Sequence, residues 1–119
     1  MPLFEKARIE VYLPDVRHPA YPELLAHLES EFAHTFGGCT VVRGLAGSYL
    51  SRLGSVIHDQ VNLLYTDTSF SCATNLAGIA DYADELRDVA FRALNEEAIL
   101  VVVYPVYHSR SAEVSTPAV

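Results

Sequence analysis

Basic residues are scarce in this chain of 119 amino acids, which has one lysine, Lys6, among its eight basic residues. The 15 acidic residues outnumber them, and the formal net charge is −7 at pH 7. A protein that follows a phosphate backbone or an anionic lipid surface needs a stripe of positive charge, which this sequence lacks. We therefore expect neither nucleic acid nor a membrane surface as a partner.

Long hydrophobic runs are absent as well. The longest apolar run, residues 98–104, is far shorter than the roughly 20 residues of a membrane-spanning helix. The first residues lack the basic and apolar regions of a signal peptide, which predicts a cytoplasmic protein. The only cysteines, Cys39 and Cys72, match no metal or redox spacing, and we expect a reducing compartment to keep them as thiols.

The composition that remains is typical of one globular domain. Half of the residues are hydrophobic and 19% are charged, a balance that favours independent folding. The length leaves no room for a second domain. We expect a single domain over residues 1–108 and a flexible, polar C-terminal tail over residues 109–119.

The apolar pattern predicts two strand-helix-strand halves in tandem. Residues 7–13 alternate as a half-buried strand, and residues 21–36 have the apolar spacing of a helix that Gly37 ends. A second helix begins near Thr74 or Asn75. The other strands are predicted over residues 39–45, 56–66 and 98–106. This order is that of the ferredoxin-like β-α-β-β-α-β sandwich, an α+β fold whose antiparallel sheet carries two helices on one face.

The second face of such a sheet has no helix to cover it. Alternation predicts Leu63 and Tyr65 on the inward face, together with alternate residues of the last strand. The outward apolar residues would then be Leu64, Leu100, Val102, Tyr104 and Val106. Because a large apolar patch is uncommon on a monomer, we expect a homo-oligomer, either a dimer or a trimer.

Residues 44–55, between the second and third predicted strands, exceed the length of a tight turn, so we expect a flexible loop. Its glycines free backbone amides, and its serines and arginines add donors able to hold a small anion. The candidate ligand-binding residues are Arg43, Gly47, Ser48, Tyr49 and Arg52. The lysine and spacing of a phosphate-binding P-loop are missing, so a connection without a ligand is the alternative.

Polar side chains on the third and last strands form a second candidate site. We expect His58 and Asn62 to share a sheet face with Tyr104. His58 would act as a general acid or base there, while Asn62 and Tyr104 orient a substrate. Interface hydrogen bonds or contact with solvent would explain the same residues, so whether the protein is an enzyme stays open.

The first predicted helix carries a polar stripe with imidazoles and carboxylates at intervals of four, four and three residues. The residues of this stripe are Glu23, His27, Glu31 and His34. A solvated helix face explains them without a metal, and no third fixed ligand is apparent nearby. The sequence therefore predicts no metal site, and it assigns no cofactor.

Two resemblances bear on the fold. The first rests on three segments: Phe36-Gly37-Gly38-Cys39-Thr40-Val41-Val42-Arg43-Gly44, Gly47-Ser48-Tyr49 and Val61-Asn62-Leu63-Leu64-Tyr65. With these segments the chain resembles small uncharacterised bacterial ferredoxin-like proteins that have a Gly-Gly-x-Thr-Val segment. That resemblance implies a fold and no activity. In layout the chain is also similar to the PII signal-transduction and divalent-cation-tolerance proteins, trimers with a long loop between the second and third strands. Their sequence motifs are absent here, so this similarity implies assembly more than ligand.

Three functions compete at this point. The favoured one is an oligomeric regulatory or binding module for a small anionic metabolite. The alternatives are a small dimeric ferredoxin-like enzyme with a pocket at the sheet face, and a scaffold whose product is the assembly itself.

Overall fold

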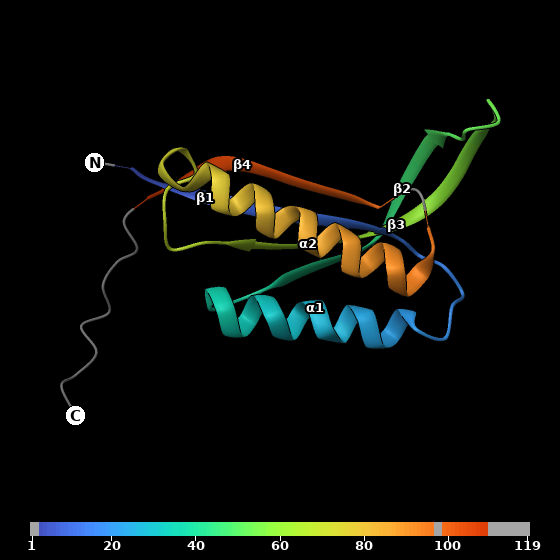
Figure 1. The fold of residues 1–119 in the computed structure, drawn as a ribbon, viewed down its shortest axis with the longest axis horizontal. Coiled ribbons are helices and arrows are strands. Elements are labelled where there is room, and N and C mark those ends of the chain that lie inside the picture. Colours follow the sequence, from blue (N-terminus) through green and yellow to red (C-terminus); the bar gives the residue numbers. More distant parts are fainter. Residues whose placement is uncertain (1–2, 97–98, 110–119) are drawn as a thin grey trace.

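The computed structural model describes residues 3–96 and 99–109. It consists of a four-stranded antiparallel sheet with both long helices on one face (Figure 1). The elements are β1 (Phe4–Pro14), α1 (Tyr21–Phe36), β2 (Thr40–Leu50), β3 (Val56–Asp67), the 3-10 turn η1 (Ala73–Asn75), α2 (Leu76–Leu94) and β4 (Leu100–His108). The predicted ferredoxin-like fold is confirmed. Most of the predicted tail, residues 110–119, lies outside the described residues, as does the predicted start of the last strand at residue 98.

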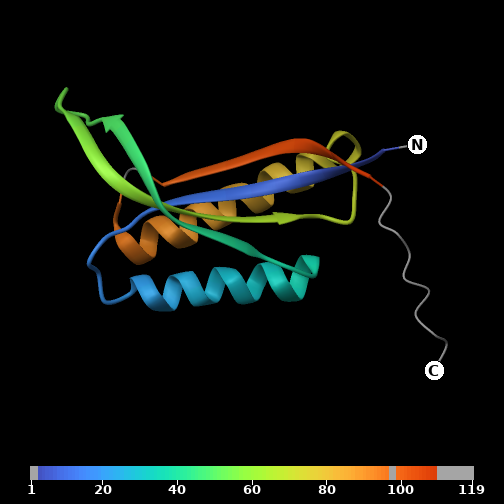
Figure 2. The ribbon, with the colours of Figure 1, turned by 180° about the vertical axis from the view of Figure 1, so that it is seen from behind.

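The sheet has the strand order β2-β3-β1-β4, and each neighbouring pair is antiparallel. α1 packs against β3 and α2 against β4, so the helices lie side by side beneath the sheet (Figures 1 and 2). Within the described ranges, the opposite face of the sheet has no helix over it (Figure 2). We call this uncovered face the outer face.

α1 forms as the sequence predicts. Its buried side comprises Tyr21, Leu24, Leu25, Leu28 and Phe32. Gly37 ends the helix with φ of 93° and donates its N–H to the Ala33 carbonyl over 2.9 Å. Only glycine takes this left-handed conformation at little steric cost, so the helix terminates where the sequence places it.

α2 starts after Asn75, but the side chain of Asn75 does not cap it. The Asn75 amide donates to the Ser71 carbonyl over 2.9 Å instead. The buried residues of α2 are Ile79, Leu86, Ala90 and Leu94. Phe36 of α1 meets the ring of Tyr82 edge-on at 5.5 Å, which joins the two helices.

The predicted faces of β3 are reversed in the structure. Leu64 is fully buried, because its pairing with Val11 places it over the helices. Leu63 and Tyr65 lie on the outer face, opposite Tyr12 and Glu10. Because positions 61–65 carry apolar side chains on both faces, alternation alone cannot choose between the two registers. The prediction for β4 is confirmed, since Val101 and Val103 pair with inward residues of β1 and leave Leu100, Val102, Tyr104 and Val106 on the outer face.

The predicted flexible loop over residues 44–55 is instead a long β-hairpin. β2 continues to Leu50 and β3 begins at Val56, so that only residues 51–55 form the turn. A bulge between Val42 and Leu45, with Gly44 at φ of 74°, turns β2. At Gly47 a side chain would place its Cβ 2.8 Å from Cγ2 of Val61. The glycines that suggest a loop therefore serve a bulge and a close approach between strands.

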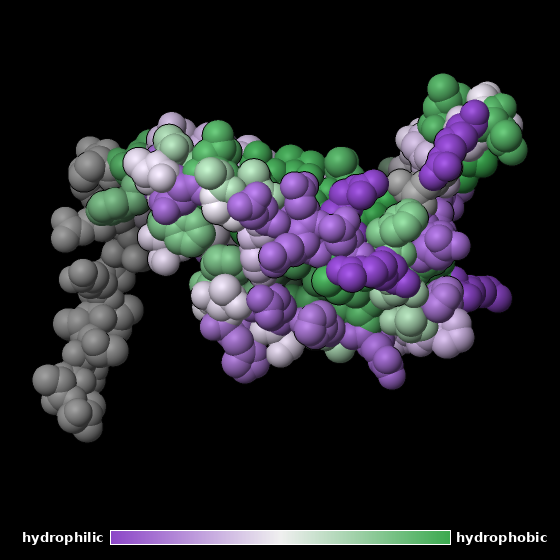
Figure 3. All heavy atoms as spheres, viewed as in Figure 1, coloured by the Kyte–Doolittle hydropathy of each residue, from purple (hydrophilic) through white to green (hydrophobic). Residues whose placement is uncertain are grey.

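The hairpin extends past the helices and carries exposed hydrophobic side chains (Figure 1). Leu50 is 69% exposed and Leu53 is 95% exposed. Figure 3 shows hydrophobic residues both on this projection and along the upper edge of the molecule, over β4. The described surface is therefore apolar in two regions that the helices do not cover.

Candidate functional site

The structure separates the predicted ligand-binding residues into neighbouring positions along the hairpin. Gly47, Ser48 and Tyr49 line a groove of about 390 Å³ where the hairpin meets the sheet. Tyr49 also lines a depression of about 330 Å³ that contains Arg52. Arg43 lies within the bulge between Val42 and Leu45 and lines neither of these two hollows. The structure thus brings Gly47, Ser48 and Tyr49 together in one hollow and Tyr49 and Arg52 together in the other, and it places Arg43 in neither.

The base groove, as we call the first hollow, is bounded by the hairpin, the end of β1 and the start of β4. Its other lining residues are Tyr12, Pro14, Asp59, Val61, Ile99 and Leu100. Leu100 is 54% exposed, so the floor of the groove offers apolar surface to a ligand. Asp59 places a carboxylate on one wall. This lining suits an apolar body with limited polar contacts.

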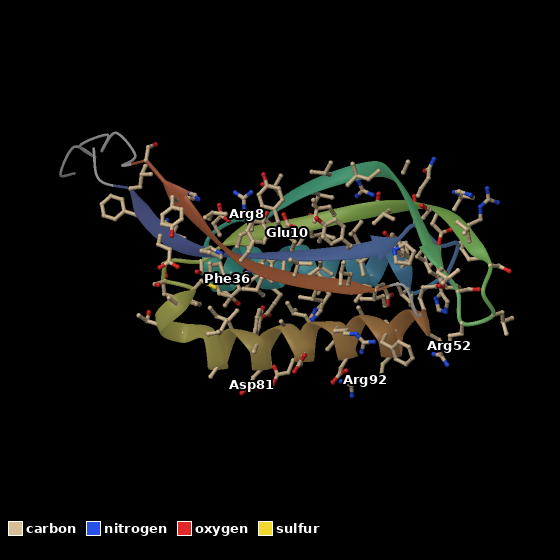
Figure 4. The ribbon with its side chains drawn as sticks, turned by 90° about the horizontal axis from the view of Figure 1, so that it is seen from above. Arg8, Glu10, Phe36, Arg52, Asp81 and Arg92 are labelled. Atoms are coloured by element: carbon tan, nitrogen blue, oxygen red, sulfur yellow. The ribbon has the colours of Figure 1, made fainter. Side chains whose placement is uncertain are left out.

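The arginine depression, as we call the second hollow, is lined by arginines from two elements. Arg52 comes from the hairpin turn and Arg87 from α2, with Leu50 and Phe91 beside them. In Figure 4 Arg52 lies next to the C-terminal part of α2. Tyr49 and Arg52 each have an interaction partner within the protein. Tyr49 lines both hollows, so an apolar groove and a depression with two arginines adjoin at this residue.

The outer face holds a buried carboxylate between two tyrosines. Glu10 is only 8% exposed although no helix covers it. Its Oε1 accepts a hydrogen bond from Tyr12 over 2.8 Å, and its Oε2 accepts one from Tyr104 over 2.6 Å. These bonds to the Glu10 carboxylate raise the pKa of both tyrosines above the ordinary value. Both hydroxyls therefore stay protonated as donors at neutral pH.

A second polar cluster lies next to Glu10 on the same face (Figure 4). Arg8 donates to both carboxylate oxygens of Asp67, over 2.7 Å and 2.9 Å. Nε2 of His108 lies 2.8 Å from Oδ2 of Asp67. Arg8 also lies 4.5 Å from the ring centre of Tyr65. The hydrogen bonds from Arg8 lower the pKa of Asp67 below its ordinary value.

This lowered pKa predicts an acid-sensitive contribution to stability. A carboxyl group whose pKa is lower in the folded state stabilises the fold above its unfolded pKa, about 3.9, and this contribution disappears as the pH falls through the folded pKa. The stability of the D67N variant should therefore decline less between about pH 5 and pH 2 than that of the wild type. Urea unfolding at a series of pH values measures the difference. D81N, at an exposed position of α2, is the control, and equal declines for D67N and wild type would contradict the prediction.

The predicted catalytic residues do not converge. Asn62 is 1% exposed on the helix side of the sheet, whereas Tyr104 is on the outer face. His58 lies on the exposed hairpin. It is nine residues along β3 from Asp67, which is level with Tyr104 across β1, so the separation along the strand is roughly 30 Å. The outer-face residues that do meet Tyr104 are Arg8 and Glu10, which alternate with the buried residues of β1. That alternation is the sequence signal by which Arg8 could have been found.

The polar stripe of α1 makes local contacts. Glu31 accepts hydrogen bonds from Tyr82 over 3.1 Å and from Thr35 over 3.2 Å. His34 lies 2.7 Å from the Ser30 carbonyl. The remaining members of the stripe, Glu23 and His27, are exposed. Among residues 3–96 and 99–109, no three histidine, cysteine or acidic side chains are grouped as metal ligands.

Two further observations concern the rest of the described chain. Burial raises the pKa of the Cys39 thiol, which disfavours the reactive thiolate. Neither α1 nor α2, the two long helices that the structure describes, is both long and apolar enough to cross a membrane.

Comparison with known proteins identifies the fold. No family model matches the chain, and no curated protein sequence matches it. CutA1 from Oryza sativa superposes with a TM-score of 0.53 and 17% identity, over 87% of this chain and 82% of the other. The divalent cation tolerance protein Cut A1 from Thermus thermophilus superposes with a TM-score of 0.52 and 17% identity, over 87% of this chain and 84% of the other. The third structure is CPII, a nitrogen regulatory PII-like protein from Thiomonas intermedia bound to ADP, AMP and bicarbonate. It superposes with a TM-score of 0.51 and 15% identity, over 92% of this chain and 100% of the other. The chain therefore shares the ferredoxin-like fold and the layout of CutA1 and PII-like proteins.

Proposed function

We propose that the protein is an oligomeric regulatory module that binds a small anionic metabolite with an apolar body. The observation that carries this proposal is that the base groove and the arginine depression share Tyr49 as a lining residue. The apolar body would lie between Tyr12, Val61 and Leu100, and the anionic group would lie against Arg52 and Arg87. Guanidinium groups suit carboxylates and phosphates because their N–H donors are held in a plane.

A ligand in this position would contact several elements at once. The groove is built from the hairpin, β1 and β4, and the arginine depression adds α2. Binding would therefore favour one position of the hairpin relative to the sheet, which is how a ligand regulates a surface element. The similarity to CPII, whose structure contains ADP, AMP and bicarbonate, supports the anionic class of ligand.

The outer face supports the oligomeric part of the proposal. Val102 and Val106 are half-buried there, and neither lines the base groove. A second copy packed on this face, as a dimer or a trimer, would bury that apolar surface. Cys39 and Cys72 are both free thiols, which is consistent with a cytoplasmic location.

Binding of 1-naphthyl phosphate, measured by calorimetry against inorganic phosphate, tests the proposed function. The naphthyl ester should bind more tightly, because only it has an apolar body for the base groove. R87A should weaken its binding by about 10- to 150-fold, since hydrogen bonds to charged groups contribute roughly 1.5 to 3 kcal/mol.

R92A is the matched control for that experiment. Arg92 is an exposed arginine of the same helix, and its Nε donates to the Asp88 carbonyl rather than lining the hollow. R92A should bind the ester like the wild type. Absence of naphthyl phosphate binding, or an equal loss in both variants, would refute the proposed site.

A further inference from the structure

A buried asparagine lies where the hairpin leaves the sheet. Asn62 of β3 is 1% exposed and sits on the helix side. Its Nδ2 donates to the Tyr21 hydroxyl over 2.7 Å, and its Oδ1 accepts the Gly44 N–H over 3.1 Å. One amide side chain thereby joins the first residue of α1 to the bulge of β2.

The position of Asn62 is otherwise suited to an apolar residue. It pairs with Leu13, and the next inward residue of β3 is Leu64, which is fully buried. An apolar side chain at position 62 would fill the same space but would leave the Gly44 N–H and the Tyr21 hydroxyl without these partners. A buried polar group that loses its partner is costly. The hydrogen bonds to Tyr21 and Gly44 therefore explain why position 62 carries an asparagine.

The elements joined by Asn62 are those that set the direction of the hairpin. The register shift between Val42 and Leu45 occurs at Gly44, whose φ of 74° marks the turn in the strand. If the hairpin swung away from the sheet, Gly44 would move relative to the start of α1. Such a movement would break the hydrogen bond between Asn62 and Gly44.

We infer that Asn62 and Tyr21 are positioning residues, which hold the hairpin at a fixed angle to the sheet and so keep the base groove in shape. A backbone bond from the Asp15 N–H to the Gln60 carbonyl, 2.8 Å long, adds a second attachment close by. The part of the inference that concerns the groove rests on the proposed function. The part that concerns the hairpin angle does not.

Hydrogen exchange of the full chain tests the positioning role in the Y21F variant. The ring of Tyr21 is retained, but the amide of Asn62 loses its acceptor. Hairpin amides within residues 45–50 and 56–61 should exchange about 5- to 150-fold faster than in the wild type, from the roughly 1 to 3 kcal/mol of an unsatisfied buried group. Amides in the ladder between β1 and β4, away from the hairpin, should change much less.

Y82F is the matched control. The Tyr82 hydroxyl is also part-buried and donates to Glu31, but it lies between the helices, away from the hairpin. Exchange of the hairpin should stay at the wild-type rate in this variant. Unchanged hairpin exchange in Y21F, or equal acceleration across the whole sheet, would overturn the inference.

The double variant Y21F/N62L separates positioning from general stability. The double variant removes the unsatisfied Asn62 amide of Y21F, so it should recover the part of the unfolding stability that this amide costs. The Gly44 N–H, which keeps its Asn62 acceptor in Y21F, loses it in the double variant, so hairpin exchange should remain fast. Recovery of slow hairpin exchange together with stability would show a purely structural role and overturn the inference.

Binding of 1-naphthyl phosphate to the same variants tests the link to the groove. Affinity should fall in both Y21F and Y21F/N62L, in parallel with hairpin exchange. If the wild type binds no naphthyl phosphate, the proposed function and the groove part of the inference both fail, while hairpin exchange still decides the positioning role. If the wild type binds and the variants bind equally well, only the groove part is overturned.

Discussion

The V106E variant is expected to yield folded monomers where the wild type is assembled. Val106 is half-buried on the outer face and pairs with Lys6 of β1. Within one chain a glutamate at this position meets a lysine on the neighbouring strand, which makes it tolerable. In an interface packed on the outer face it would bury a charge at a penalty of several kcal/mol per ion.

Native mass spectrometry and sedimentation of V106E measure this outcome, with circular dichroism as the test of folding. V89E is the matched control, because Val89 is 37% exposed on α2, on the side of the sheet away from the outer face. V89E should assemble like the wild type. A monomeric wild type, or a V106E protein that assembles as well as the wild type, would contradict an interface on the outer face.

The F32A variant is expected to lose about 3 to 5 kcal/mol of unfolding free energy. Phe32 is fully buried on α1 and contacts the ring of Phe36 edge-on, with 6.1 Å between ring centres. Removal of a buried aromatic ring loses its transfer free energy and leaves a cavity that the sheet and helices fill only in part. This is the largest single-residue effect on folding that we expect.

Urea unfolding in the V106E background measures the F32A effect, because the stability of an assembled protein depends on its concentration. L53A is the control, since Leu53 is 95% exposed at the hairpin turn and should change stability by no more than about 0.5 kcal/mol. A loss of less than about 1 kcal/mol in F32A would mean that the helix packs on the sheet less tightly than the structure indicates.

The fold was predictable because each element has a strong local pattern. The core side of α1 follows the apolar spacing, and Gly37 ends the helix in the left-handed conformation. β1 alternates cleanly, and its inward residues are buried throughout. The faces of β3 were predicted wrongly because Leu63 and Leu64 are equally apolar, and only their pairing with β1 shows which one is buried.

The candidate site was predictable only in part. Tyr49 and Arg52 were selected from the sequence and line the candidate site, but their segment is a hairpin and not the expected loop. Arg87 and Leu100 belong to the same surface and were not selected, because they lie far along the sequence in α2 and β4. No spacing rule connects residues that are brought together by the packing of separate elements.

The sequence by itself determined the order of the strands and helices, the ends of α1 and the apolar character of β4, because these depend on neighbouring residues and on periodicity. The tertiary structure alone decided the face of Asn62, the direction of the hairpin and the placement of Arg52 and Arg87 around one hollow. These features arise from strand register and from contacts between distant segments. The free energy that stabilises them comes from contacts between elements, so it cannot be inferred from the sequence of any one element.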